Sequence, residues 1–408
     1  MSTYSYIMLS HMHSFPRAIA HIDADCFFAA VELLHLPQLK GKPICVCNRT
    51  DQRGIVVSAT YEARPFGIRA GTPVFQAKKL CPQAIFLPSH FDWYGATSHR
   101  LIQLLKTFSP DVEASSIDEA YLDLTGLRLL YRTDYRGIGA KIQAAVEQKL
   151  GITVSVGIAP TKILAKIASD FKKPAGLTVV SLKTLTHFLR NISIGKIPGV
   201  GRNTEALLHK YRLFTAYDLA HFSRAKEILG KRGIELQSEL QGTAVYKVVE
   251  SDTLPKSLSR TRTFPDFSSD RNYIFSFSLK LLTDLTKRLR EFELVAQEIN
   301  FFLLTKNFQT IEQNVKLISR TNEDDPFIAS FKTLFVKIFQ PNTMYRKSGF
   351  SFFNLESIKT DQQPTLFETT EDPGKIHKNR LYEAIDSISR KYGEKGITRG
   401  NLVKFPLK

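Results

Sequence analysis

A segment near the amino terminus changes its hydrophobic period from two to about 3.6 within a few residues. Residues 18–25 (AIAHIDAD) alternate loosely, which predicts a strand, and FFAAVELL follows at once with a helical pattern. The carboxylates Asp23 and Asp25 lie at this junction. A strand that runs directly into a helix favours a layered α/β fold, in which helices pack on a sheet.

The same alternation continues through the first half of the chain. Helical patterns at about 99–108 and 138–150 and in TKILAKIASDF are separated by the strand-like runs VEASSIDEAYLDLTG and ITVSVGIA. In TKILAKIASDF we expect Thr161 to cap the helix. We expect Ile163, Ile167 and Phe171 to form its buried face. These patterns extend the α/β layer to about residue 180.

A chain of 408 residues exceeds what one hydrophobic core usually supports, so further domains are expected. Two helical patterns around PGVG, at 198–201, predict a helix-hairpin-helix. Beyond about Ser251 a new strand-and-helix pattern predicts a separate α+β domain that ends near Phe353. Residues 358–378 are polar and acidic, as in a linker, and a helical pattern of unassigned role covers about 380–392.

The chain is strongly basic, with a net charge of +17 and a pI of about 9.6. The excess is spread over all regions rather than gathered in a tail, which favours several domains lining one polyanion; simple solubility is the alternative. Four cysteines without C-x-x-C pairs argue against a structural zinc site and a secreted disulfide scaffold. No signal peptide or membrane-spanning run is recognisable, so we expect a cytoplasmic protein that does not enter a membrane.

Asp118 and Glu119 stand between strand-like residues in SSIDEAYLD. Adjacent strand residues point to opposite faces, so two neighbouring carboxylates can serve one site only where a turn re-aims one of them. Clustered carboxylates repel one another unless a cation neutralises them, and hard oxygen ligands suit Mg²⁺ or Mn²⁺. Two solvated turn acids remain the alternative, because the pattern alone does not bring Asp23 near them.

Five segments stand in the order HIDADCFFAAVE, SATYEARPFGIRAGTP, SSIDEAYLDLTG, VSVGIAPTKILAKIASDFKKPAGL and IPGVGRNTEALL. With these segments the chain resembles Y-family DNA polymerases of the DinB type over most of its length. The resemblance implies a multidomain α/β and α+β protein shaped as a right-hand polymerase. Its parts would be a ferredoxin-like palm (16–27 and 93–181), small fingers (28–92), a helical thumb with the helix-hairpin-helix (182–250), a little-finger domain (255–353) and a tail (354–408).

The resemblance also implies roles for residues of the palm and fingers. Asp23, Asp118 and Glu119 would be catalytic and would hold two Mg²⁺ ions, for which Mn²⁺ can substitute. Phe28 would be the steric gate that excludes a 2′-hydroxyl, although by pattern it could be an ordinary core aromatic. Tyr61, Arg64 and Lys166 would bind the triphosphate, although singly each could be a solvated surface residue. For Asp25 we expect a helix N-cap, and for Lys162 a surface position.

DNA-binding and partner roles follow from the same resemblance. Gly199 and Gly201 would let backbone amides approach a DNA phosphate, with a plain tight turn as the alternative. Arg260 and Arg262 in KSLSRTRTF would share one face of the first little-finger strand. Thr261 and Ser115 depart from residues common in the family, which leaves the subgroup open.

The tail segment QPTLF, with Gln363, Leu366 and Phe367, resembles the peptide that bacterial polymerases dock on a sliding clamp. Docking of its apolar residues on the protein's own body is the alternative.

The function implied is template-directed, error-prone translesion DNA synthesis by a monomer, which adds deoxynucleoside triphosphates to the primer of a primer-template DNA. The alternatives are a UmuC-type polymerase that needs accessory subunits and a catalytically silent DNA- and clamp-binding factor. A nucleotide cyclase could use a two-metal palm but would have no use for a helix-hairpin-helix or a clamp peptide. All three candidate metal ligands are present, which disfavours the silent factor.

Overall fold

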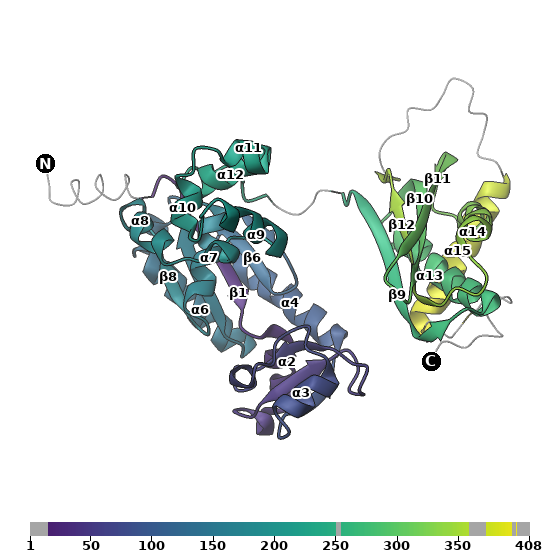
Figure 1. The fold of residues 1–408 in the computed structure, drawn as a ribbon, viewed down its shortest axis with the longest axis horizontal. Helices are drawn as coiled ribbons and strands as arrows, with labels where there is room; N and C mark the ends of the chain where they lie inside the picture. The colour runs from purple at the N-terminus through teal and green to yellow at the C-terminus, as the bar shows by residue number, and fades with distance from the viewer. Residues whose placement is uncertain (1–14, 250–253, 359–372, 394–396, 398–408) are drawn as a thin grey trace, which may run out of the picture. The chain divides into compact units, whose positions relative to one another are not determined.

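The computed structural model describes residues 15–249, 254–358, 373–393 and 397. The chain divides into two compact units, Met1–Ser251 and Asp252–Lys408, and each has its own hydrophobic core (Figure 1). Each unit is therefore described by itself.

The larger sheet of the first unit has the strand order β5-β6-β1-β7-β8. These strands are β1 (Ile19–Ala24), β5 (Val112–Ala114), β6 (Glu119–Asp123), β7 (Val154–Ala159) and β8 (Leu177–Val179). Neighbouring strands are antiparallel except for the parallel pair β7 and β8. The strand predicted at 18–25 is confirmed as β1, and it is central and fully buried.

Helices cover both faces of this sheet. Helices α4 (Phe91–Lys106) and α6 (Tyr135–Leu150) share a core with one face, and α7 (Lys162–Phe171) packs on β1 and β7 from the other. The hydroxyl of Thr161 accepts a hydrogen bond from the amide of Leu164, so the predicted cap is confirmed. Ile163 and Ile167 are buried as predicted. The expectation for Phe171 is wrong: it is 43% exposed and lies edge-on to Phe188 at the last turn of α7.

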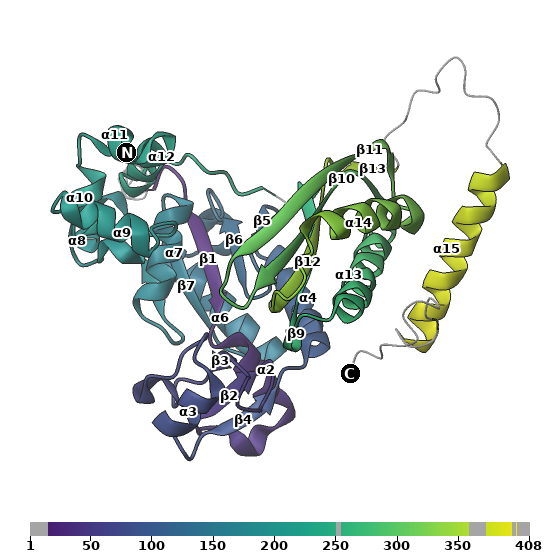
Figure 2. The ribbon, with the colours of Figure 1, turned by 45° about the vertical axis from the view of Figure 1, so that its right-hand side comes forward.

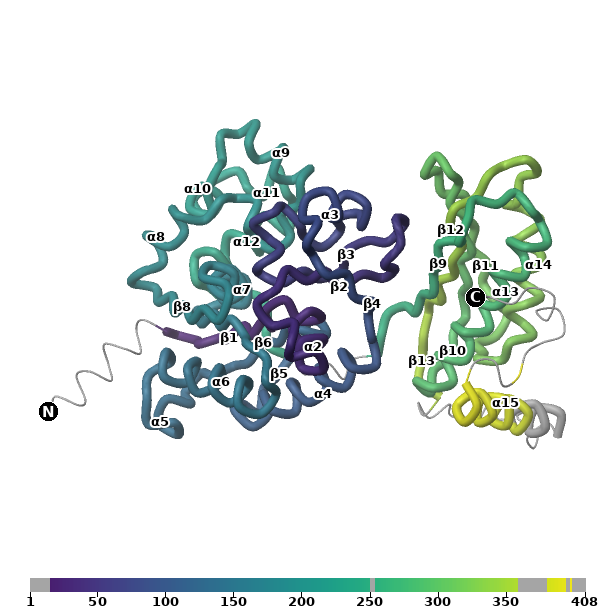
Figure 3. Tube along the Cα trace, turned by 90° about the horizontal axis from the view of Figure 1, so that it is seen from below, coloured from purple at the N-terminus to yellow at the C-terminus, as the bar shows by residue number. Residues whose placement is uncertain are grey.

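A smaller sheet has the strand order β3-β2-β4, and Figure 3 shows these strands beside α2 and α3. This sheet has a hydrophobic core of its own. Its elements are α2 (Phe27–His35), η1 (Pro37–Leu39), β2 (Ile44–Cys47), β3 (Val56–Ala59), η2 (Arg64–Phe66), α3 (Val74–Leu80) and β4 (Ile85–Pro88). Apolar residues of α3 pack on β2 and β3, and α2 contacts both of these strands. The junction predicted between β1 and a helix is confirmed, because α2 begins three residues after β1 ends.

The carboxyl-terminal part of the first unit is helical. It contains α8 (Leu182–Arg190), η3 (Ile194–Lys196), α9 (Arg202–Lys210), α10 (Ala216–Ala220), α11 (Ala225–Leu229) and α12 (Lys231–Leu240), and α5 (Arg128–Tyr131) lies earlier in the chain. The structure corrects one detail of the hairpin: the segment just before PGVG forms only a 3₁₀ turn, η3. A helix on that side is found in α8, which ends at Arg190. Ile192, Ile194 and Ile197 are buried, so packing accounts for their apolar pattern without a second long helix.

The second unit is an antiparallel sheet, β11-β10-β12-β9, with helices on one face (Figure 2). Its elements are β9 (Ser257–Ser268), α13 (Arg271–Glu291), β10 (Leu294–Thr305), β11 (Thr310–Thr321), α14 (Asp324–Ile338), β12 (Tyr345–Phe353), β13 (Glu356–Ser357) and α15 (Pro373–Tyr392). Helices α13 and α14 share a core with alternate residues of β10 and β12. The predicted α+β domain is confirmed, and the helical pattern at 380–392 is the second half of α15.

Among the described residues, no helix combines the length and the apolar character that crossing a bilayer requires.

Candidate active site

Strand pairing brings two of the three predicted carboxylates together. Asp23 on β1 lies directly opposite Glu119, the first residue of β6. Asp118 precedes it in the loop between β5 and β6, and its carbonyl accepts a hydrogen bond of 3.0 Å from the amide of Ala24. The expected hairpin turn is present and contains Asp118, but the placement of Glu119 in the turn is wrong, because Glu119 begins β6. Antiparallel pairing therefore brings together Asp23 and Asp118, which are ninety-five positions apart in the sequence.

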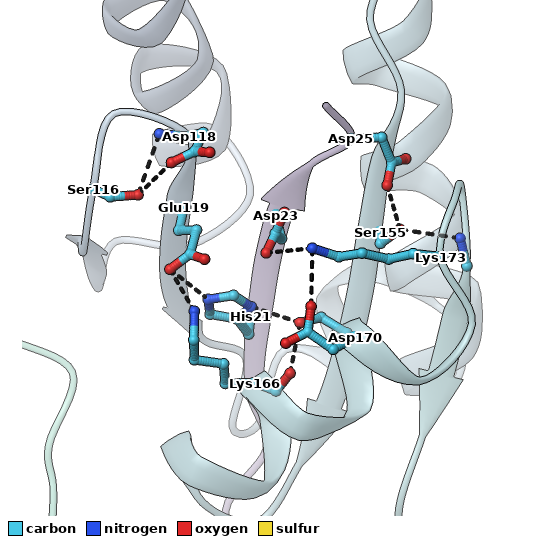
Figure 4. Close-up of polar contacts among 12 residues, drawn as sticks. His21, Asp23, Asp25, Ser116, Asp118, Glu119, Ser155, Lys166, Asp170 and Lys173 are labelled. Atoms are coloured by element: carbon cyan, nitrogen blue, oxygen red, sulfur yellow. Dashed lines mark hydrogen bonds and ion pairs between the residues drawn. The ribbon is translucent and has the colours of Figure 1, made fainter. Parts of the chain in front are cut away.

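The carboxylate of Asp118 has a different orientation from the other two. Its Oδ1 accepts a hydrogen bond of 2.6 Å from the hydroxyl of Ser116, in the same loop (Figure 4). Within the described part of the chain, no three His, Cys, Asp or Glu side chains are grouped closely enough to hold a metal ion. The backbone thus gathers the three acids, and a side-chain rotation at Asp118 is needed for their carboxylates to converge.

Two lysines contact the other two carboxylates. Lys173 Nζ lies 2.6 Å from Asp23 Oδ2 and 2.9 Å from Asp170 Oδ1, and Lys166 Nζ lies 2.5 Å from Glu119 Oε2 (Figure 4). Burial raises the pKa of Asp23 to about 7, and the carboxylates of Glu119 and Asp170 act in the same direction against the opposing effect of Lys173. A clustered, partly desolvated set of carboxylates of this kind favours a cation.

A buried histidine lies beneath Glu119. His21 has no exposed surface, its Nδ1 lies 2.8 Å from the hydroxyl of Ser169, and its Nε2 lies 3.6 Å from Glu119 Oε2. Burial lowers the pKa of His21, so the ring is neutral at pH 7. His21, followed by Lys166, holds the pKa of Glu119 far below its usual range. Glu119 is therefore ionised at any pH at which the protein works.

One cavity of about 400 Å³ is lined by six of the seven residues predicted for catalysis and nucleotide binding. Its lining includes Asp23, Asp118, Glu119, Phe28, Tyr61 and Arg64, together with Arg69, Asp170 and Lys173. Lys166 is not part of the lining, but it forms an ion pair with Glu119, which is.

The expectation of a surface position for Lys162 is wrong: its Nζ bonds both oxygens of Glu113, at 2.6 and 2.7 Å.

Aromatic rings support Phe28 at the cavity wall. Its ring stacks on Tyr94 with centroids 4.2 Å apart and meets Phe91 edge-on. The hydroxyl of Tyr94 donates to the fully buried carboxylate of Glu32 and accepts from the amide of His90. Burial raises the pKa of Tyr94, so this hydroxyl stays protonated at neutral pH. Phe28, the candidate steric gate, is thus held in place by Tyr94, whose own position is fixed by its hydrogen bonds to Glu32 and His90.

The predicted N-cap role of Asp25 is wrong. Helix α2 is preceded by Cys26, which has φ 41° and makes no side-chain cap. This left-handed residue turns the chain between strand and helix and leaves Asp25 pointing back into the protein. Asp25 is 2% exposed and accepts hydrogen bonds from Tyr61, Thr153, Ser155 and the amide of Ala175.

Sequence reasoning missed several residues of the site, namely Asp170, Lys173, His21, Glu32 and Tyr94. Asp170 and Lys173 stand inside one of the quoted segments, so their position in the chain was available as a signal. Glu32 is also within such a segment, but a glutamate on an amphipathic helix usually faces solvent. Only the packing of α4 against α2 brings Tyr94 to Glu32.

The glycines of the hairpin differ in their structural constraint. Gly199 has φ +87°, and a Cβ there would lie 1.8 Å from a guanidinium nitrogen of Arg232. Gly201 is extended and has open space where a Cβ would be, and it precedes α9 as its N-cap. Backbone conformation and packing thus require a glycine at 199 alone.

Arg260 and Arg262 share one face of β9, as predicted from strand alternation. They pair in register with Phe350 and Ser348 of β12, whose side chains pack toward the helices. The guanidinium of Arg260 lies 3.7 Å from Asp284 on α13. Both arginines are exposed, at the edge of the face that carries α13 rather than on the open face of the sheet.

The segment with Gln363, Leu366 and Phe367 lies outside the described residues.

Models of a known family match both units of the chain. The impB/mucB/samB family model matches residues 22–170, and the model of that family's C-terminal domain matches residues 255–366. DNA polymerase IV of Oceanobacillus iheyensis is 32% identical over 388 residues, which cover 94% of this chain and 91% of the relative. DNA polymerase IV 1 of Bacillus subtilis is 31% identical and covers 95% of this chain, with 94% of its own length matched.

The chain belongs to the impB/mucB/samB family of Y-family DNA polymerases. Its relatives support the DinB type, and its activity is that of a DNA-directed DNA polymerase in translesion synthesis. They do not favour the UmuC-type enzyme or the silent binding factor. As a Y-family polymerase it depends on a divalent metal.

Solved Y-family structures share the fold. A chimera of the Dbh and Dpo4 polymerases superposes with a TM-score of 0.75 at 28% identity, covering 83% of this chain and 99% of the chimera. DinB from Sulfolobus solfataricus gives a TM-score of 0.55 at the same identity, over 82% of this chain and 98% of its own. The right-hand polymerase architecture expected from the sequence is thus confirmed.

Proposed function

We propose that the cavity lined by Asp23, Asp118 and Glu119 is the nucleotidyl-transfer site, and that these carboxylates hold two Mg²⁺ ions, for which Mn²⁺ can substitute. One observation carries the proposal: the three acids line the same cavity as Phe28, Tyr61 and Arg64. The donor set fits, because it consists of hard carboxylate oxygens whose mutual repulsion a divalent cation relieves. When bound, such ions activate the primer 3′-hydroxyl and neutralise the charge that develops on the phosphates.

The protein's own side chains prepare this site. Lys173 and Lys166 neutralise Asp23 and Glu119, and Asp118, which bonds Ser116, would hold a metal ion after rotation of its side chain. Arg64 offers a planar fork of donors to phosphate oxygens, and Lys166 supplies a mobile positive charge. Tyr61 supplies a hydroxyl donor, and the ring of Phe28 excludes nucleotides with a 2′-hydroxyl.

The substrates proposed are primer-template DNA and deoxynucleoside triphosphates. One solved structure with 28% identity and a TM-score of 0.57 is an insertion ternary complex of Dbh DNA polymerase, which supports this choice. Gly199 and Gly201 would place backbone amides against a DNA phosphate, a contact that is independent of base sequence. Arg260 and Arg262 would contact the DNA backbone from the edge of β9.

The division into functional domains remains a proposal, with the boundaries predicted from the sequence. The palm would be residues 16–27 and 93–181, the fingers 28–92, the thumb 182–250 and the little finger 255–353. In the tail, 354–408, Gln363, Leu366 and Phe367 would bind a sliding clamp. We propose that the enzyme acts as a monomer in the cytoplasm, where bacterial chromosomal DNA is found.

Primer extension on a defined template tests the metal ligands. Asp118→Ala should abolish nucleotide incorporation, because a ligand of the reacting centre is lost, while binding of primer-template DNA stays nearly intact. Asp111→Ala is the matched control, since it removes an exposed acid at the base of the same hairpin. Robust synthesis by Asp118→Ala would refute the metal assignment.

A further inference from the structure

The carboxylate of Asp25 is buried at the boundary between the two sheets of the first unit. Its Oδ1 accepts hydrogen bonds from the hydroxyls of Tyr61, at 3.2 Å, and Ser155, at 2.8 Å. Its Oδ2 accepts from the hydroxyl of Thr153, at 3.0 Å, and from the amide of Ala175, at 2.8 Å. Asp25 is therefore an acceptor for one residue of β7, the residue just before β7, one turn amide and one residue of the nucleotide cavity.

The hydroxyl of Tyr61 has a single proton to donate. Tyr61 lines the cavity, and the guanidinium of Arg64 lies 3.9 Å from the centre of its ring. Burial, followed by the charge of Asp25, raises the pKa of Tyr61, so the hydroxyl is protonated at neutral pH. In the structure the hydroxyl of Tyr61 donates its hydrogen bond to Asp25. A phosphate in the cavity would then face the lone pairs of the phenol oxygen, which repel an anion.

We propose that Asp25 sets nucleotide affinity by competing with the triphosphate for the hydroxyl proton of Tyr61. The inference rests on the proposed role of Tyr61 in triphosphate binding. On nucleotide binding, the O–H group turns from the carboxylate of Asp25 to a phosphate oxygen, and Asp25 keeps its bonds to Ser155, Thr153 and Ala175. Asp25 does not touch the nucleotide in this scheme, so it is a positioning residue.

The substitution Asp25→Asn separates this role from a structural one. The amide of Ala175 can only donate, so the side-chain oxygen of the asparagine must face it, and the NH₂ group then faces Tyr61 and Ser155. Both hydroxyls can rotate to accept from that NH₂ group. The proton of Tyr61 is then released toward the cavity, and the triphosphate no longer competes with a carboxylate for it.

The experiment measures the Kd of a correct deoxynucleoside triphosphate for the full-length enzyme on primer-template DNA that ends in a dideoxynucleotide. We expect Asp25→Asn to lower this Kd about threefold to tenfold, the usual difference between charged and neutral hydrogen-bond acceptors. Thr153→Val is the matched control, because it removes a donor from the other oxygen of the same carboxylate. It should lower the melting temperature and leave the Kd unchanged.

A second background distinguishes failure of the inference from failure of the proposed function. Tyr61→Phe should raise the Kd, and Asp25→Asn should have no further effect in that background. If Tyr61→Phe leaves the Kd unchanged, the proposed role of Tyr61 is wrong. If Tyr61→Phe raises the Kd but Asp25→Asn raises it equally in both backgrounds, or leaves it unchanged, the competition is refuted.

A third variant tests the same competition without changing Asp25, and it decides the matter should Asp25→Asn fold poorly. Ser155→Ala removes the other donor to Oδ1, so that oxygen holds the proton of Tyr61 more strongly. The Kd should rise about twofold. An unchanged or lower Kd in Ser155→Ala contradicts the proposal.

Discussion

At the scale of single residues, the site depends on contacts between side chains that are distant in sequence. Phe28 illustrates this, because its ring is stacked on Tyr94 and is not free to move away from an incoming sugar. We expect Phe28→Ala to raise ribonucleotide incorporation relative to deoxynucleotide incorporation by about 100-fold, since the ring alone would fill the space of a 2′-hydroxyl. Single-nucleotide incorporation with paired ribo- and deoxynucleotides measures this ratio.

Phe27 provides the control for that experiment. It is almost fully buried beside Phe28 and belongs to the core of the larger sheet. Phe27→Leu should lower stability by about 1 kcal/mol through lost packing and leave sugar selection unchanged. Equal selectivity in Phe28→Ala and wild type would show that the gate lies elsewhere.

At the scale of elements, α7 connects the larger sheet to the helical part of the first unit. The buried hydroxyl of Thr161 accepts from Leu164 and donates to the carbonyl of Glu239, 2.9 Å away in α12. Thr161→Ala should lower the free energy of unfolding by about 2 kcal/mol, because the helix loses its cap and a buried carbonyl loses its donor. Urea denaturation measures the loss, and Thr161→Ser should retain most of the stability.

Helix α15 is joined to the second unit by a charge network. Arg290 on α13 bonds both oxygens of Asp386 on α15, at 2.7 and 3.1 Å, and Oδ1 of Asp324 on α14, at 3.0 Å. Arg290 also lies over the ring of Tyr382. These contacts show what holds α15 in the second unit, a helix whose role the sequence left unassigned.

Removing the guanidinium should detach α15, because Arg290→Met removes both charged hydrogen bonds to the buried Asp386 of that helix. Amide hydrogen exchange of residues 380–392 should rise at least tenfold, while exchange in the strands of the same unit stays unchanged. The control is Arg288→Met on the same helix, where the side chain is exposed. Similar protection of α15 in both variants would mean that Arg290 does not hold the helix.

At the scale of the whole molecule, the two compact units have separate cores, and the basic excess is distributed over both. A polymerase that grips DNA at many points gains from such a distribution, because each phosphate contact adds to affinity without reading sequence. Recruitment to a clamp would then depend on a short peptide and not on the catalytic unit.

Deleting 363–367 tests that separation. Synthesis without a clamp should be unchanged, and stimulation of synthesis by a sliding clamp should be lost, because the apolar anchors Leu366 and Phe367 are removed. Primer extension with and without a loaded clamp measures both quantities. The double substitution of Thr369 and Thr370 by alanine, in the same linker, should keep the stimulation; persistent stimulation in the deletion would reject the motif.

The sequence by itself determined the local elements and the candidates for chemistry. The change of period at β1 and α2, the cap at Thr161 and the turn at Asp118 were all correctly predicted, because each depends on residues within a few positions. The family motifs likewise identified six of the residues that line the cavity, among them all three candidate metal ligands.

The tertiary structure alone decided which of these residues meet. Asp23 lies opposite Glu119 only because β1 pairs with β6. Asp25 became an acceptor instead of a cap because the fold brings four donors to its carboxylate, namely the hydroxyls of Tyr61, Thr153 and Ser155 and the amide of Ala175. Arg260 lies toward α13 for the same reason, since strand alternation predicts a shared face but not which face the helices cover. Hydrophobic periodicity is a property of neighbours along the chain, whereas the partners of a buried polar group are set by packing between distant segments.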